Sequence, residues 1–544
     1  MLYFIPAWYQ QNQWCENEQS WWSRHMHTEF DDTVKQIQLF HRSSACPYHI
    51  LLLSFTPNFR HFLHRQGVYR APYWSCFDAI QEVRRKKASV LSFHNLKWPE
   101  KIEFIYSMFA VVAMLHKKKY AQIDFGEDGN PIRIDLYQNE KLSRRNIYDD
   151  RGFVSSTILF EDGNPLYQDY LMENGMWKMR FFYQDGHVQI NEKCPEYMLR
   201  YLDEMQNRRF SRLYYESMEQ VIYEVLASYI ELTKEQDVFC MAMHERHTKL
   251  LKKALENKKL ILSFFGDRYS VAGHPESSEL IEEADYIIAD STKNVTKIQE
   301  ESEKLIENII AIPPYDSRVD LGISQQLDVQ KILVPVDGME EEKFCKLIRL
   351  LGEYVLFNEA ARVCLFTRRA EYVRKQNVLE RVRGELRKAG LEEGWAAEKE
   401  REKSLENDLE LDEYIPVKFF VEQCVDELAV SKCMREQRVL VDVREVPELY
   451  LQITAISMGI PQIVWTETEF VEHDRNGIIL KDMERLPDAV NYYLDGLKNW
   501  NQAMICSYEL VKEYTTEKLL EKWKEVMDSI GADSYFTIGE RGLE

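Results

Sequence analysis

Ala455-Ile456-Ser457-Met458-Gly459-Ile460-Pro461-Gln462-Ile463 is the stretch that defines the local fold most clearly. Small and apolar residues up to Met458 favour a buried helix, and Gly459 can take the left-handed conformation in which helices commonly end. Pro461 cannot continue a helix, and it precedes the apolar residues of a strand. The stretch therefore predicts a helix, a tight turn and a buried strand, which is one repeating unit of an alternating α/β fold.

The same alternation precedes this turn. Short apolar segments that fit buried parallel strands are separated by segments with helical spacing. Five strands are expected here, over 331–336, 362–366, 417–420, 438–441 and 462–465. The charged stretch 371–411 is expected to be a solvated helical hairpin, with a partner-binding arm as the alternative. We therefore predict a Rossmann-type lobe over 315–500.

An earlier series of strands and helices predicts another lobe of the same kind. Its strands are expected over 2–5, 48–55, 237–241, 259–264 and 285–288, and the Pro-Pro pair that ends 309–314 marks a lobe boundary. Helices are expected to resume over 195–232, on a face that includes Leu199, Leu202 and Met205. A terminal helix over 501–529, in a segment 501–544, is expected to cross back to this first lobe.

The helical spacing disappears between Gln122 and Ile190, where turn dipeptides recur. Asp-Gly and Asn-Gly pairs supply the positive φ angles of two-residue hairpins. They are Asp128-Gly129, Asp162-Gly163, Asn174-Gly175 and Asp185-Gly186. We therefore predict an antiparallel β-meander over 122–193, inserted into a first lobe made of 1–121 and 194–314. The expected fold class is α/β: two doubly wound Rossmann-type lobes with an inserted extended antiparallel β-sheet.

Charge and composition exclude several classes of partner. The chain has 69 Lys and Arg against 90 Asp and Glu, a formal net charge of -21, and such a surface repels nucleic acid and anionic lipid headgroups. The ten cysteines are scattered without metal-ligand spacing, which predicts reduced core thiols and no metal site. No apolar run approaches the roughly 20 residues of a membrane helix, and the N-terminus lacks signal-peptide features. We therefore expect a cytoplasmic protein.

Particular segments of the sequence resemble known proteins, first those of a fold class and then those of one family. The 455–463 element resembles the A-x-[AS]-x-G-x-P sequence in the nucleotide-sugar lobe of GT-B glycosyltransferases, and Asn476-Gly477 and the tail KLLEKW at 518–523 fit that context. The run DSRVDLGISQQ at 316–326, the strand KILVPVDG, the opening FIPAWY, the early EFDDTVKQIQLF and the meander are similar to one family. On these segments the whole chain is identified as a member of the accessory secretory proteins of Gram-positive bacteria, specifically their GT-B-like member.

The resemblance carries expectations about function and partners. It implies a component of the accessory Sec system that supports export of serine-rich-repeat glycoprotein adhesins. The implied partners are two companion accessory secretory proteins, one esterase-like and one carbohydrate-module-like, an accessory SecA-type motor ATPase and the adhesin cargo. Membrane association is expected only through these partners, at the cytoplasmic face via the translocon. No cofactor is implied.

Three features that a retaining GT-B enzyme needs are missing. The loop after the first strand, 7–14, carries bulky aromatic residues where glycine would let the backbone approach a phosphate. Alignment on the Gly-x-Pro turn places the paired donor-binding acids at Val446 and Thr454, which lack carboxylates. The loop 337–343 carries three successive glutamates where cations would be needed. We therefore predict no catalytic or cofactor-binding residues, only vestigial donor-lobe positions: Val446, Thr454, Ala455, Ser457, Gly459 and Pro461.

An active enzyme remains an alternative under a shifted register. Glu445 or Glu448 would then replace a missing carboxylate, and Arg318 or Lys331 would replace the missing cation. Such a protein would be a GT-B glycosyltransferase acting on Ser/Thr-rich protein.

A further alternative is a carbohydrate-binding module that recognises glycosylated cargo. Trp8, Tyr9 and Trp14, together with Trp21 and Trp22, would then stack on sugars or anchor a partner, although packing is the commoner role of such clusters. His244 and His247 are too closely spaced for a zinc-protease motif, which favours an ordinary core or surface role over a vestigial sugar-binding one.

Overall fold

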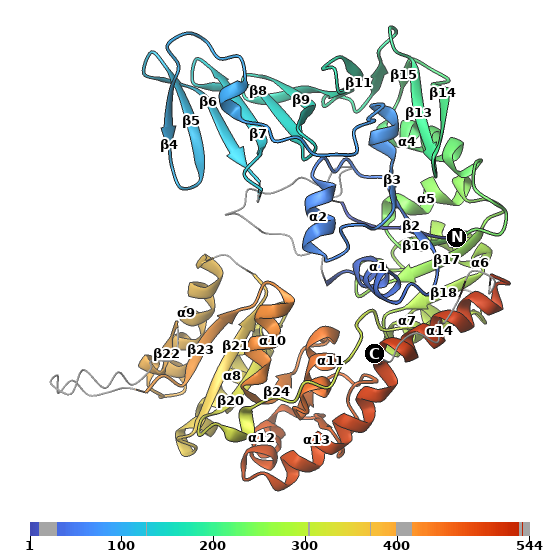
Figure 1. Ribbon diagram of the computed structural model, residues 1–544. Coiled ribbons are helices and arrows are strands. Elements are labelled where there is room, and N and C mark those ends of the chain that lie inside the picture. The colour runs from blue at the N-terminus through green and yellow to red at the C-terminus, as the bar shows by residue number, and fades with distance from the viewer. Residues whose placement is uncertain are drawn as a thin grey trace. The chain divides into compact units, whose positions relative to one another are not determined.

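The computed structural model describes residues 1–9, 30–126, 128–302, 305–369, 372–398, 416–532 and 536 (Figure 1). The chain forms two compact units. Unit 1 consists of Met1–Asp290, Asn294–Pro314 and Trp523–Glu544, and unit 2 consists of Ser291–Lys293 and Tyr315–Lys522. Unit 1 is thus built from segments on both sides of unit 2 in the sequence.

The centre of unit 1 is a seven-stranded parallel sheet in the order β19-β18-β17-β16-β1-β2-β3. Its strands are β1 (Leu2–Ile5), β2 (Tyr48–Leu52), β3 (Tyr73–Ser75), β16 (Val238–Ala242), β17 (Lys259–Phe264), β18 (Tyr286–Ala289) and β19 (Ile309–Ala311). Its helices are α1 (Asp32–Ser43), α2 (Phe59–Arg65), α3 (Cys76–Ile80), α4 (Met218–Ile230), α5 (Glu245–Ala254), α6 (Ser278–Glu283) and α7 (Thr292–Glu301). The strand order reverses between β1 and β16, which is where doubly wound sheets bind their ligands.

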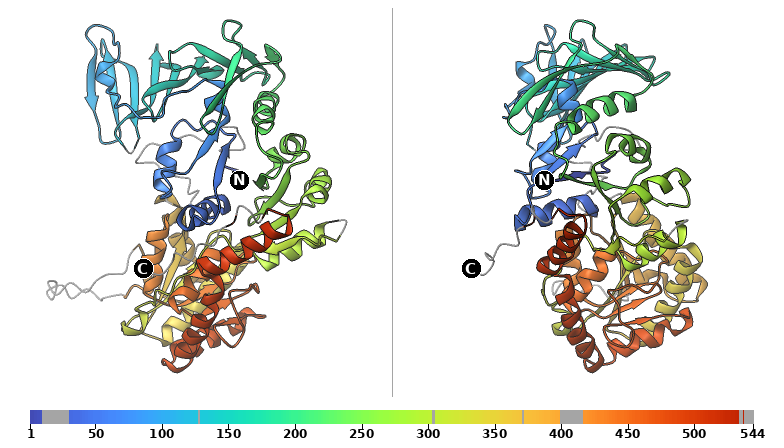
Figure 2. Two further views of the ribbon diagram at one scale, coloured as in Figure 1. Left: turned by 45° about the vertical axis from the view of Figure 1, so that its right-hand side comes forward. Right: turned by 90° about the vertical axis from the view of Figure 1, so that its right-hand side faces the viewer.

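The inserted sheet is antiparallel and ten-stranded, in the order β15-β12-β11-β10-β9-β8-β7-β6-β5-β4. Its strands are β4 (Glu103–Tyr106), β5 (Ala110–Leu115), β6 (Lys118–Phe125), β7 (Pro131–Gln138), β8 (Lys141–Asp149), β9 (Phe153–Glu161), β10 (Asn164–Leu171), β11 (Trp177–Phe182), β12 (Val188–Ile190) and β15 (Tyr214–Tyr215). In both views of Figure 2 the sheet extends away from the Rossmann-type sheet of unit 1.

The glycines of the four predicted turn dipeptides all have positive φ, between 76° and 87°, which confirms those turns. The sheet nevertheless starts before the predicted residue 122. Its hairpins at His116–Lys117 and Asn139–Glu140 take positive φ angles of 49° to 64° without any glycine. The His116–Lys117 turn lies before residue 122 and lacks the dipeptide signal, so the strands there were not predicted.

The helix predicted from residue 195 is wrong over its first half. Residues there form an antiparallel hairpin, β13 (Glu196–Tyr201) and β14 (Glu204–Arg209), and α4 begins only at Met218. Leu202 turns the hairpin with a φ of 54°. Leu199 is fully buried, whereas Leu202 and Met205 are exposed, so their three-residue spacing does not mark a helical face.

Unit 2 contains a parallel sheet in the order β22-β23-β21-β20-β24-β25-β26. Its strands are β20 (Gln330–Pro335), β21 (Ala361–Thr367), β22 (Ala396–Ala397), β23 (Phe419–Gln423), β24 (Gln437–Asp442), β25 (Gln462–Val464) and β26 (Gly477–Ile479). Its helices are α8 (Glu341–Phe357), α9 (Tyr372–Lys388), α10 (Glu427–Arg435), α11 (Leu449–Met458), α12 (Leu486–Leu494) and α13 (Lys498–Val511). All five predicted strands are present, and the short strands β22 and β26 are additional.

The charged stretch 371–411 begins with α9, and residues 399–411 lie outside the described part of the chain. The terminal helix predicted over 501–529 is two helices, α13 and α14 (Thr516–Ser529), separated by a short 3-10 turn. Trp523 of α14 is buried in unit 1, where its ring meets Phe4 and Phe40 edge-on with centroid distances of 6.3 and 5.2 Å. Within the ranges described, no helix is long and apolar enough to cross a membrane.

Candidate functional site

The C-terminal ends of the parallel strands are the places to look for a site in each unit. In unit 1 the residues that follow β1 turn back into the protein. Trp8 is 3% exposed, its indole N–H donates to Asp31 Oδ1 at 3.0 Å, and its ring packs on Phe62 and Phe59. Little of Trp8 is accessible to a sugar or a partner. Of the other aromatic residues in the cluster, Trp14, Trp21 and Trp22 lie outside the described residues.

Tyr9 contacts the histidine pair that follows β16. Its hydroxyl donates to His247 Nε2 at 2.5 Å, and His247 Nδ1 donates to the carbonyl oxygen of Ala242 at 2.7 Å. Burial lowers the pKa of His247 to about 3 and that of His244 to about 4. His247 is therefore a neutral imidazole with both nitrogens engaged inside the fold, which fits the ordinary core role.

This burial predicts a pH-dependent effect of replacing His247. Between its pKa of about 3 in the folded state and the usual 6.5, only the unfolded state binds the proton, so stability falls as pH falls, by about 1.4 kcal/mol per pH unit. His247→Gln removes this contribution. The deficit in unfolding free energy of the variant at pH 6 should therefore shrink by roughly 1.4 kcal/mol per unit down to pH 4.

Urea unfolding of both proteins at pH 6, 5 and 4 measures that difference. The pKa of Asp31, raised to about 7 by burial and by Asp32, acts in the opposite sense in both proteins and cancels in the comparison. A deficit that stays constant over this pH range would show that the imidazole is not held neutral.

A cluster of paired charges lies close to the parallel sheet of unit 1. The Arg268 guanidinium donates to Asp32 Oδ1 and Oδ2 at 2.5 and 2.9 Å and to Asp31 Oδ2 at 3.2 Å. Asp32 also accepts from the Ser263 hydroxyl at 2.6 Å. The Arg268 guanidinium is thus paired with carboxylates of the chain itself.

In unit 2 the vestigial donor-lobe positions lie on α11 and its turn. The Thr454 and Ser457 hydroxyls donate to carbonyl oxygens one turn back, of Tyr450 at 2.6 Å and Ile453 at 2.9 Å. Gly459 ends α11 with a φ of 70°, and a Cβ there would lie 2.5 Å from Met504 Cγ. Ala455 and Pro461 are buried, whereas Val446 is half exposed. These positions build the predicted helix–turn–strand and present no carboxylate.

Glu445 and Glu448, the carboxylates that a shifted alignment register would supply, are both paired with cations. Glu445 accepts from Lys343 and Glu448 accepts from Arg368. The cations suggested for that register lie elsewhere. Arg318 is exposed near Asp316, and Lys331, at the N-terminal end of β20, donates to Glu436 at 2.8 Å.

The C-terminal ends of β20, β21 and β24 carry an arginine–carboxylate network that the sequence analysis missed. Asp337 accepts from the Thr367 hydroxyl and the Arg368 backbone N–H, both at 2.8 Å, and from Arg374 at 3.2 Å. Arg444 donates to both oxygens of Asp442 at 2.8 and 2.7 Å and to the Asp337 carbonyl at 3.0 Å. We call Asp337, Arg368, Arg374, Asp442, Arg444 and Glu448 the unit 2 network. The signal available in the sequence for this network was an arginine just after each of two strands, in Thr367-Arg368-Arg369 and in Asp442-Val443-Arg444.

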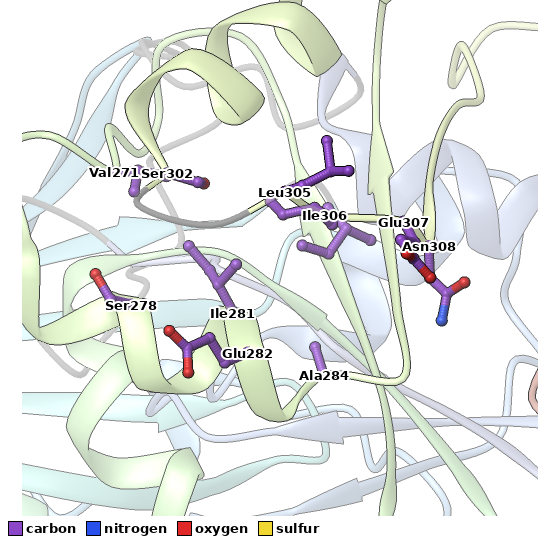
Figure 3. A pocket seen from close by; sticks show the side chains of 11 residues that line it. Val271, Ser278, Ile281, Glu282, Ala284, Ser302, Leu305, Ile306, Glu307 and Asn308 are labelled. Carbon is purple, nitrogen blue, oxygen red and sulfur yellow. The ribbon is translucent and has the colours of Figure 1, made fainter.

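Two further candidates among the described residues are a metal centre and a pocket of unit 1 beside α6. No group of three or more His, Cys, Asp or Glu among the described residues is arranged to hold a metal ion. A pocket of about 340 Å³ lies in unit 1 between α6 and the segment before β19 (Figure 3). Its walls include Val271, Ile281 and Ile306, and its charged groups are Glu282 and Glu307. Such a lining offers no cation for a nucleotide diphosphate.

Two Rossmann-type sheets and an inserted antiparallel sheet define a protein of the GT-B class. A solved structure of the pneumococcal O-GlcNAc transferase GtfA, in complex with UDP and GlcNAc, matches with a TM-score of 0.68 over 98% of this chain and 99% of that one, at 12% identity. The likeness confirms the predicted GT-B-like fold.

The family model for the accessory Sec system protein Asp-one, where Asp stands for accessory secretory protein, matches residues 1–529. The chain belongs to this family and is a component of the accessory Sec system. A Streptococcus gordonii relative of that name is 32% identical over 539 residues, 96% of this chain and 98% of the relative. A crystal structure of accessory secretory proteins 1, 2 and 3 from Streptococcus pneumoniae matches with a TM-score of 0.77 at 30% identity, over 98% of this chain and 99% of that one.

Proposed function

We propose that this chain is a non-catalytic, glycosyltransferase-like scaffold that supports export of a serine-rich-repeat glycoprotein adhesin. It would act in a complex with the two companion accessory secretory proteins, with the accessory SecA-type motor ATPase and with the adhesin cargo. Its place is the cytoplasm, at the cytoplasmic face of the membrane through the translocon. The pneumococcal relative that crystallised with accessory secretory proteins 2 and 3 supports the assembly.

The observation that carries the absence of catalysis is the unit 2 network. A nucleotide-sugar site needs cations that are available for a diphosphate and carboxylates that are available for the sugar and ribose hydroxyls. Here Arg444 is paired with Asp442, Arg368 with Glu448, and Lys343 with Glu445. A diphosphate that used one of these three cations would have to displace a carboxylate that is already paired with it. Binding would therefore lose most of the charge-assisted hydrogen bonds that normally provide it.

Calorimetric titration with UDP, UDP-glucose and UDP-N-acetylglucosamine tests this proposal. We expect no heat at millimolar ligand and no sugar transfer to a Ser/Thr-rich peptide. The pneumococcal O-GlcNAc transferase, which crystallised with UDP, serves as the positive control in the same buffer. Micromolar binding together with transfer that Glu448→Gln abolishes would overturn the proposal and establish an active enzyme.

A further inference from the structure

A pocket of about 590 Å³ lies in unit 1 among α2, β3, the loop after α3 and the hairpin β13–β14. Among the described residues that line it, Asp78 is the only acidic one. Its cationic residues are Arg60, Arg70, Arg85, Lys86, Arg151 and Arg200. The run Arg84-Arg85-Lys86-Lys87 supplies two of them, in a chain whose formal net charge is -21. We call this hollow the basic pocket.

Three of these cations already hold carboxylates of the chain. The pairs are Arg60–Asp150, Arg85–Glu173 and Arg151–Asp78, with nitrogen–oxygen distances of 3.9, 3.6 and 2.8 Å. Glu173 also accepts from the backbone N–H groups of Arg84 and Arg85 at 2.6 and 2.8 Å. The cations and amides around the pocket are therefore arranged to bind carboxylates.

The other three cations have no such partner. Arg70 and Lys86 are exposed and Arg200 is half-buried, and no carboxylate of the described chain lies within 4 Å of their nitrogen atoms. Trp74 also lines the pocket and is 5% exposed, and its buried indole N–H has no acceptor among the described residues. Buried polar groups nearly always have a partner. These groups fit a ligand that carries several anionic oxygens.

Carboxylates fit the basic pocket better than phosphate does. Phosphate sites commonly use several free backbone N–H groups, at a helix N-terminus or in a loop. Here the Asp78 N–H in the first turn of α3 donates to the Ser75 hydroxyl at 3.2 Å, and Glu173 takes the N–H groups of Arg84 and Arg85. Side-chain cations remain, and the three pairs that they already form are all with carboxylates.

The rim of the pocket favours a peptide segment over a small molecule. Small-molecule sites are mostly apolar and enclose their ligand, whereas Arg70 and Lys86 are exposed. Tyr69 and Leu202, 51% and 54% exposed, also line the pocket and can pack on the apolar parts of a peptide. An anionic bilayer or a second copy would bring a large negative charge toward a chain that is itself acidic, and a short segment brings only a few charges.

We propose that the basic pocket binds an extended acidic segment of a partner protein, through Asp or Glu side chains that pair with Arg70, Lys86 and Arg200. This inference goes beyond the proposed function and does not depend on it. Arginine binds a carboxylate through two parallel N–H bonds. Because Arg70 and Lys86 are open to solvent, salt should screen the attraction.

Fluorescence anisotropy of labelled hexaglutamate, titrated with the full chain at low salt, measures this binding. Hexaglutamine with the same label is the uncharged control, and it should bind at least tenfold more weakly. Raising sodium chloride from about 50 to about 300 mM should weaken hexaglutamate binding at least threefold.

Two double variants locate the binding. Arg70→Ala/Lys86→Ala should weaken hexaglutamate binding about fivefold or more, because it removes two cations without carboxylate partners. Arg209→Ala/Arg212→Ala removes the same charge from exposed positions of unit 1 outside the pocket lining, and it should change the affinity less than about twofold. All four side chains are exposed, so both doubles should melt within about 2 °C of the parent.

The possible outcomes separate the ligands. Hexaglutamate that binds no more tightly than hexaglutamine overturns the inference, and so does an equal loss from both doubles. Binding of UDP or of phosphatidylglycerol vesicles, or self-association in light scattering, that Arg70→Ala/Lys86→Ala abolishes while hexaglutamate binding persists would assign the pocket to that ligand instead. UDP binding that this double leaves unchanged concerns unit 2, and it contradicts the proposed function alone.

Discussion

Replacing Arg444 with alanine is expected to lower the free energy of unfolding of unit 2 by about 3–5 kcal/mol, because the change leaves a buried carboxylate without its partner. The Asp442 side chain is fully buried at the end of β24, and the Arg444 side chain is 8% exposed. Arg444 also donates to the backbone of the loop after β20. Urea or thermal unfolding of the purified variant gives the loss.

Two further variants make this result specific. Arg318→Ala removes an exposed arginine that lies 3.7 Å from Asp316, and it should cost less than about 1 kcal/mol. Asp442→Ala/Arg444→Ala removes both buried charges and should recover part of the loss. If Arg444→Ala lowers the free energy of unfolding no more than Arg318→Ala, the unit 2 network does not hold the strand ends together. The proposed absence of a nucleotide-sugar site then loses its support.

Replacing Trp523 with alanine is expected to destabilise unit 1 by about 3–5 kcal/mol, because it leaves a large cavity in a packed core. The Trp523 ring is 1% exposed and lies against Phe4 of the central strand and Phe40 of α1. Few neighbours are placed to collapse into that space, since β1 is itself buried throughout. Differential scanning calorimetry of the full chain measures the shift.

Lys524→Ala is the matched control on the same helix. Lys524 is exposed, so its truncation should shift stability by less than about 0.5 kcal/mol. An equal effect of the two substitutions would mean that α14 contributes through its helical propensity and not through Trp523 packing.

Most strands of the two parallel sheets were predictable because each is a short apolar run between helical segments, whereas the short strands β3, β22 and β26 were not predicted. The sequence-based strand over 259–264 has the same bounds as β17, and those of the second lobe differ from the observed ones by a few residues. The inserted sheet was predictable only where glycine marks its turns. His116–Lys117 and Leu202 take positive φ without glycine, because strand pairing on both sides fixes the turn. Local sequence does not carry that information.

The candidate site was also predictable only in part. The absence of carboxylates at Val446 and Thr454 and of glycine in the loop 7–9 could be read directly from the sequence. The pairing of Arg368 with Glu448 joins residues 80 positions apart, and that of Lys343 with Glu445 joins residues 102 apart. Spacing along the chain cannot predict such pairs, because they depend on which strand ends lie side by side. The edge-on contact of Trp523 with Phe4 is of the same kind.

The discontinuity of unit 1 has a consequence for synthesis on the ribosome. Residues 315–522 are translated between the two parts of unit 1, and at typical rates this takes roughly 10–40 s. During that interval the face of Phe4 and Phe40 lacks the helix that covers it. The nascent chain therefore carries an aromatic surface that its own last segment covers only after that segment has left the ribosome.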